Sequence, residues 1–96
     1  MSIASFDDDI TQRFFETGKV KKGTPWGSLQ SVVMRKLDMV HYAAQLSDLR
    51  SPPGNRLKEL SGALKGYHSI RINDQFRIVF KWTEAGPALV RVCDYH

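Results

Sequence analysis

Apolar and polar residues alternate in the last third of the chain, and this period of two predicts β-strands. Three such runs occupy residues 68–73, 75–82 and 88–95; Asn73-Asp74 joins the first two, and Gly86-Pro87 is expected to form a turn before the third. Because neighbouring side chains of a strand point to opposite faces, each run has one apolar side. The apolar sides contain Ile70, Ile72, Phe76, Ile78, Phe80, Trp82, Ala88, Val90 and Val92.

The first half of the chain has the spacing of helices instead. Asp7, Asp8 and Asp9 supply N-cap chemistry for a helix that Gly18 ends. Thr24-Pro25 opens a second helix, which we predict to run to about Leu46. Its apolar stripe contains Leu29, Val33, Leu37, Val40 and Ala44, whereas Arg35, Lys36 and Asp38 lie off that stripe.

Shorter segments complete the expected fold. We expect a short strand over 3–6, a helix-breaking loop over 50–55 with two prolines and a glycine, and another short strand over 56–60. The whole chain, 1–96, is then a single α+β domain. In it, two N-terminal helices pack on one face of a mostly antiparallel, twisted sheet of four to five strands.

The polar sides of the C-terminal runs carry positive charge. With the apolar sides under the helices, one open face of the sheet collects Arg71, Arg77, Lys81, Arg91 and Tyr95. Guanidinium groups bind phosphate in a two-pronged geometry, and an aromatic ring stacks on an unpaired base. This pattern favours RNA as a ligand, and an ordinary solvated sheet face is the alternative.

The chain ends in residues with acid–base capacity, Asp94, Tyr95 and His96. RNA is cleaved when its own 2′-hydroxyl attacks the next phosphate, a reaction that needs a proton acceptor, a proton donor and stabilisation of charge. Histidine serves either proton role near neutral pH, and arginine only stabilises charge. The alternative is that the terminal histidine is an ordinary mobile chain end.

Composition limits the other classes of function. Fourteen lysines and arginines against ten acids give a net charge of +4, which favours anionic partners. Lys19, Lys21 and Lys22 form a basic connector that is either a solvated loop or a contact for such a partner. The single cysteine cannot form an internal disulfide, and no spacing of cysteine and histidine predicts a metal or cofactor site. No segment has the apolar length of a membrane helix or the character of a secretory signal, so we expect a cytoplasmic protein.

The sequence resembles the HigB toxins of the RelE/ParE toxin superfamily over nearly its whole length. The residues that carry the resemblance are PPGNRLKEL at 52–60, LKGYHSIRINDQFRIVFKW at 64–82 and the final DYH, together with the opening at 3–18. The resemblance implies a RelE-like fold and an endoribonuclease that cuts mRNA in the ribosomal A site. It also implies a cognate helix-turn-helix, HigA-like antitoxin that neutralises the toxin.

The resemblance also assigns roles to residues. Arg77 would stabilise the scissile phosphate, Tyr95 would orient or stack on the nucleotide, and His96 and Asp94 would transfer or position protons. Lys58 occupies a position where some relatives carry a histidine, which leaves His96 or Glu59 as the general base. The residues expected to bind RNA are Arg71, Lys81, Arg91 and Lys65. His68 stands where relatives tend to have tryptophan, and we expect it to have a packing role.

Two other functions stay open at the level of sequence. One is non-nucleolytic inhibition of DNA gyrase, as in ParE-like members of the superfamily, and Lys58 in place of histidine leaves room for it. The other is an RNA- or protein-binding module whose activity has decayed. Arg77 and the terminal Asp-Tyr-His favour the nuclease.

Overall fold

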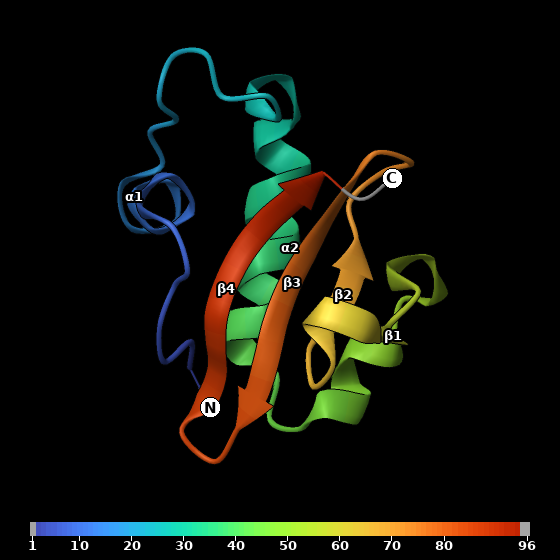
Figure 1. Ribbon diagram of the computed structural model, residues 1–96. Coiled ribbons are helices and arrows are strands. Elements are labelled where there is room, and N and C mark those ends of the chain that lie inside the picture. Colours follow the sequence, from blue (N-terminus) through green and yellow to red (C-terminus); the bar gives the residue numbers. More distant parts are fainter. Residues whose placement is uncertain (1, 95–96) are drawn as a thin grey trace.

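The structure, a computed structural model, describes residues 2–94 and contains a four-stranded antiparallel sheet with two α-helices (Figure 1). The helices are α1 (Asp9–Thr17) and α2 (Gln30–Tyr42). The strands lie in the spatial order β1 (Lys58–Glu59), β2 (His68–Arg71), β3 (Phe76–Thr83) and β4 (Gly86–Asp94). α2 runs behind β3 and β4 in Figure 1, and α1 lies beside the outer edge of β4. The predicted α+β class is confirmed.

Helix α1 forms where the aspartates and Gly18 predict it. Asp8 is the N-cap, and its Oδ1 accepts a hydrogen bond of 2.7 Å from the backbone N–H of Thr11. Gly18 ends the helix in the left-handed region at φ 76°. On the buried side, Thr11 is 1% exposed, and its Oγ1 accepts from the Val92 N–H of β4 at 3.3 Å. This bond fixes α1 to the edge of the sheet.

Helix α2 is shorter than predicted. Its central stripe is confirmed, because Val33, Leu37 and Val40 are fully buried. The helix begins at Gln30 rather than at Thr24-Pro25, where the Thr24 hydroxyl instead donates to the Lys21 carbonyl. It ends at Tyr42 rather than Leu46, and Ala44 is exposed. The reason is local: the side chain of Asp48 accepts hydrogen bonds from the N–H groups of Ala44 and Gln45, and so caps a separate 3₁₀-helix at Leu46–Arg50.

A buried polar pair joins α2 to the loop over 50–55. Lys36, predicted to lie off the apolar stripe, is only 6% exposed and donates its ammonium to the side chain of Asn55, which is fully buried. The Asn55 amide in turn donates to the backbone carbonyls of Leu49 at 3.2 Å and Ser51 at 3.3 Å. Burial of a charged group is tolerated when such partners satisfy it. The two-proline loop is therefore built around Asn55.

The segment before α1 pairs with β4 without forming the predicted strand over 3–6. Phe6 forms an isolated parallel bridge with Val90, and Ser5 accepts from the Val90 N–H at 3.1 Å. At this point β4 contains one extra residue relative to β3, because Val79 pairs with Arg91 but Lys81 pairs with Ala88. The extra residue is a β-bulge, and Leu89 there has φ 53° and donates its N–H to Ser5 Oγ at 2.9 Å.

Two predictions for the last run are therefore wrong. The bulge places Ala88 on the face of Lys81 rather than with Val90 and Val92. Gly86-Pro87 is not a turn but the start of β4, opposite Thr83 and Trp82, so the hairpin loop is Glu84-Ala85. The alternation itself is confirmed for β3, in which Phe76, Ile78 and Phe80 are buried against the helical layer.

We predict that Asn55→Ala lowers the free energy of unfolding by about 2–4 kcal/mol, because the buried Lys36 ammonium loses its acceptor. Urea denaturation measures the change. Gln12→Ala, on the exposed side of α1, is the control and should shift stability by less than about 0.5 kcal/mol. A loss below about 1 kcal/mol for Asn55→Ala would contradict the structural role of this bond.

The pKa of Lys36 gives a second prediction. Burial lowers this pKa from the ordinary 10.5, and the charges of Arg35 and Arg71 act in the same direction. The folded state therefore binds fewer protons than the unfolded state between the lowered pKa and 10.5, and stability rises with pH across that window. The difference in unfolding free energy between wild type and Lys36→Met should increase as pH rises towards 10.5. A difference independent of pH would refute the lowered pKa.

Candidate functional site

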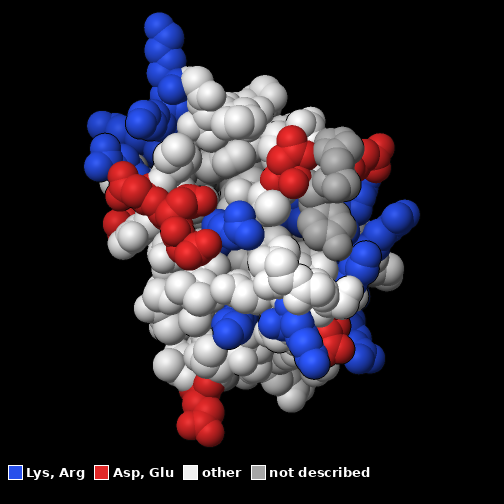
Figure 2. Space-filling view, in the orientation of Figure 1, with Lys and Arg blue, Asp and Glu red and all other residues white. Residues whose placement is uncertain are grey.

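The strand register brings the predicted cations to one face of the sheet. Arg71 on β2 lies directly opposite Arg77 on β3, and Arg91 on β4 lies opposite Val79, two residues along β3 from Arg77. Cross-strand partners share a face, so Arg71, Arg77 and Arg91 lie together, with Lys81 on the same side. Figure 2 shows this side of the molecule, with basic side chains spaced over it and acidic ones towards both edges.

The face is less open than the alternation predicts. Ser69 and Val79 belong to it, yet both are fully buried. The segment over 61–67 crosses in front of the sheet (Figure 1), and the Lys81 ammonium lies 5.3 Å from the centre of the Tyr67 ring. Lys81 thus holds this segment against the sheet through a cation–π contact. The end of the face where β3 begins and β4 finishes lies away from this segment (Figure 1).

Arg77 lies at that end and is held by three hydrogen bonds. Its Nε donates to Ser69 Oγ at 2.7 Å, and one Nη donates to the carbonyl of Arg56 at 2.7 Å and to that of Ser69 at 3.4 Å. Arg56 has a left-handed backbone at φ 46°, directly after the buried Asn55. The guanidinium plane is therefore set by two neighbouring segments. The hydrogen bonds from Arg77 to Ser69 and Arg56 were not predicted from the sequence, although alternation does put Ser69 on the same face as Arg77.

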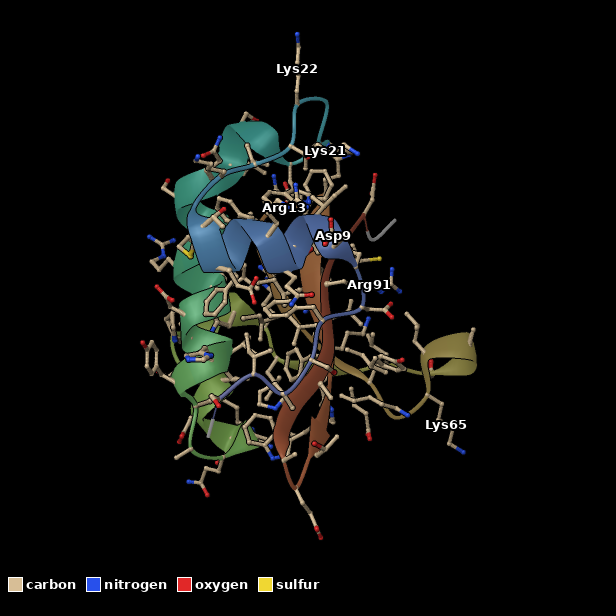
Figure 3. All side chains as sticks on the ribbon, turned by 90° about the vertical axis from the view of Figure 1, so that its left-hand side faces the viewer. Asp9, Arg13, Lys21, Lys22, Lys65 and Arg91 are labelled. Carbon is tan, nitrogen blue, oxygen red and sulfur yellow. The ribbon has the colours of Figure 1, made fainter. Side chains whose placement is uncertain are left out.

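The other cations of the face have internal partners. Arg71 forms an ion pair with Asp74 in the β2–β3 turn, and the Nε of Arg91 lies 3.3 Å from an oxygen of Asp7 at the N-terminal end of α1. About 29% of the Arg91 side chain is exposed. Lys65 extends into solvent from the segment over 61–67 (Figure 3). These contacts lower the positive charge that Arg71 and Arg91 offer to a ligand.

Strand β1 separates two candidate residues. Lys58 is exposed and pairs with Ser69, so it lies on the face of Arg77. Glu59 pairs with His68 and lies on the opposite side, where both line a pocket of about 620 Å³. His68 stacks on Phe80 with ring centres 6.4 Å apart, as expected for a packing role.

The last described residue of β4 completes this end of the sheet. Asp94 pairs with Phe76, which places it on the opposite face of the sheet from Arg77, and its carboxylate accepts a hydrogen bond of 3.1 Å from the side-chain amide of Gln75. Cys93, one residue before it, lies opposite Arg77. The predicted residues Tyr95 and His96 lie outside the described residues.

Two further properties of residues 2–94 bear on other functions. No group of three histidine, cysteine, aspartate or glutamate side chains in this part of the chain is arranged to hold a metal ion. Neither helix over the same residues is long and apolar enough to cross a membrane.

Comparison with known proteins gives close relatives. Toxin HigB-1 of Vibrio cholerae is 42% identical over 91 residues, which cover 95% of this chain and 94% of that protein. An uncharacterized protein of Haemophilus influenzae is 39% identical over 77 residues, or 80% of this chain and 75% of that protein. Among solved structures, a chain of the YoeB-YefM complex from Staphylococcus aureus superimposes with a TM-score of 0.55 over 100% of this chain and 99% of its own. Its 15% identity supports the fold alone.

The family follows from these comparisons. The model of the HigB-like toxins, described as RelE-like toxins of type II toxin-antitoxin systems, matches residues 4–96. Together with the 42% identity to a HigB toxin over almost the full length, this match shows that the chain belongs to the HigB-like family of type II toxin-antitoxin toxins.

Proposed function

We propose that this toxin is an endoribonuclease that cuts mRNA in the ribosomal A site and so inhibits translation. The observation that carries the proposal is Arg77, whose guanidinium is fixed by Ser69 and Arg56 at one end of a cationic sheet face. A preorganised cation stabilises a transition state that gains negative charge, because no reorganisation is needed during the reaction. Membership of the HigB-like toxins supports the same reaction.

The reaction uses the RNA's own 2′-hydroxyl as nucleophile. Its oxygen forms a bond to the adjacent phosphorus while the bond from phosphorus to the 5′-oxygen breaks, which leaves a 2′,3′-cyclic phosphate and a 5′-hydroxyl. The 2′ proton passes to a base, and an acid donates a proton to the 5′-oxygen. Arg77 stabilises the phosphorane-like oxygens and takes no part in proton transfer, because a guanidinium does not deprotonate in proteins.

Lys58 and the chain end supply the remaining roles in this proposal. Lys58 acts as a second phosphate contact, since it shares the sheet face of Arg77. Glu59 is disfavoured as the base because it lies on the opposite side of β1. His96 is then the preferred proton-transfer group. Tyr95 stacks on a nucleotide base, and Asp94 has a positioning role. Two residues span at most about 7 Å, so the residues after Asp94 have the reach to act beside Arg77.

The same face argues for dependence on the ribosome. Two of its cations, Arg71 and Arg91, are already paired with Asp74 and Asp7. Such a face binds free RNA weakly, so a substrate held in place by the ribosome would compensate for the missing affinity. We further propose that a cognate helix-turn-helix antitoxin neutralises the toxin, as expected for a type II system.

Arg77→Ala should reduce cleavage of mRNA on translating ribosomes by about 10²- to 10³-fold, because a fixed charge-stabilising group is lost. Mapping of new transcript ends measures the effect. Arg35→Ala, which removes an exposed arginine from α2, is the matched control and should keep full activity. Unchanged cleavage by a folded Arg77→Ala variant would show that the site is elsewhere.

Lys58 can be tested by conservative replacement. If it contributes charge alone, Lys58→Arg keeps most of the cleavage rate and Lys58→Ala lowers it by about tenfold or more. If it is the general base, both variants fail, because arginine does not accept a proton. The proposal expects the first result, together with a greater loss on deletion of His96. An equal, severe loss of cleavage in both Lys58 variants would identify Lys58 as the general base.

A further inference from the structure

A second concentration of positive charge lies away from the sheet face, in the connection between α1 and α2. Lys19, Lys21 and Lys22 lie within five positions of the end of α1 at Thr17, and Arg13 extends from α1 towards them (Figure 3). We call these four residues the basic corner. All four are exposed. The assigned reaction at Arg77 uses none of them.

The loop that carries the three lysines is anchored at both ends. Val20 packs against the hydrophobic core between Lys19 and Lys21, so the neighbouring lysines extend outwards. Trp26 is 5% exposed and lies edge-on to Phe14 with ring centres 5.1 Å apart. An anchored loop presents its charges without a large loss of backbone entropy on binding.

A tight turn orders the tip of the loop. The Lys21 carbonyl accepts hydrogen bonds from the N–H of Thr24 at 3.1 Å and from its hydroxyl at 2.6 Å. Gly23 has φ 88° in this turn, a conformation that side chains other than glycine rarely adopt. Lys22 extends from the tip of this turn, and Lys21 lies just below the tip (Figure 3).

The lysines are not neutralised within residues 2–94. The ion pairs found there join Arg13 to Asp9, Arg71 to Asp74 and Arg91 to Asp7. The first joins highly exposed groups 3.5 Å apart and is weak. A cleft of about 270 Å³ lies between α1 and the loop, lined by Asp9, Ile10, Arg13, Lys19 and Lys21. Four of these five lining residues are charged.

These properties select one kind of partner. An acidic peptide would need apolar pockets for its side chains, and Ile10 is the only apolar residue that lines the cleft among the described residues. A phosphate backbone needs only spaced cations at a surface. The basic corner also lies at the same end of the molecule as the start of β3 and the end of β4 (Figure 1). One large RNA can therefore meet both surfaces.

We propose that the basic corner binds the phosphate backbone of structured RNA outside the cleavage site, which in a ribosome-dependent toxin is ribosomal RNA. This inference rests on the proposed function for the identity of the RNA. The acidic Asp7–Asp9 region separates the corner from the cationic sheet face, as the acidic side chains at the left of Figure 2 show. The corner is thus a separate anchor rather than an extension of the mRNA path.

The test compares two double variants that each remove two positive charges. Lys21→Gln/Lys22→Gln removes the tip of the corner, and Arg35→Gln/Arg50→Gln removes two exposed arginines from elsewhere. Binding of the full chain is measured to ribosomes without mRNA and to a 20-base-pair RNA duplex, over a series of salt concentrations. Thermal unfolding confirms that both variants fold. Since these ribosomes carry no substrate, the result does not depend on cleavage.

We expect the Lys21→Gln/Lys22→Gln variant to lose about tenfold or more in affinity for ribosomes at 0.1 M salt, and the slope of log K against log[salt] to decrease by about 1 for each lost contact. The control variant should change affinity less than about threefold, through long-range charge alone. Equal losses in both variants, or no loss in either, would overturn the proposal. Loss of binding to an acidic antitoxin peptide with unchanged ribosome binding would overturn it in favour of a protein partner.

Discussion

The hydrogen bond between the Lys36 ammonium and the Asn55 amide connects the hydrophobic core to the candidate site. Lys36 extends from α2 to Asn55, and the Asn55 amide donates hydrogen bonds to the carbonyls of Leu49 and Ser51. The next residue, Arg56, turns in the left-handed region and presents its carbonyl to Arg77. The buried Lys36 ammonium therefore fixes the loop that contains Asn55, and that loop fixes the guanidinium of Arg77. Stability and the geometry of the site depend on the same few atoms.

Sheet register supplies the second constraint. Arg71, Arg77 and Arg91 meet on one face only because β2 and β4 pair with β3 without a slip at these positions. The bulge at Leu89 lies between Arg91 and the start of β4. It moves the Ala88 side chain to the other face of the sheet and leaves the faces of the three arginines unchanged. Internal partners then moderate the charge of Arg71 and Arg91. The result is a partly neutralised face on which Arg77 is held by Ser69 and Arg56.

Local sequence signals predicted the elements they control. The aspartates and Gly18 placed α1, and the period of two placed β2 and β3 and the face of the arginines. Features set by distant partners were not predictable in this way. The burial of Lys36 depends on Asn55, 19 residues away. The bulge depends on Ser5, 84 residues from Leu89. Alternation placed Tyr95 with the arginines, and the family resemblance added Lys58 and assigned roles to Asp94, Tyr95 and His96; these roles remain proposals.

The pairing of the first residues with β4 has a consequence for biosynthesis. The N–H of Leu89 and that of Val92 reach back across 84 and 81 residues, and β4 also provides the partner of Arg77's strand. Contacts so distant along the chain close the fold late, after its helices and first strands have formed. A nascent chain therefore lacks both the edge of its sheet and the completed cationic face until β4 has been synthesised.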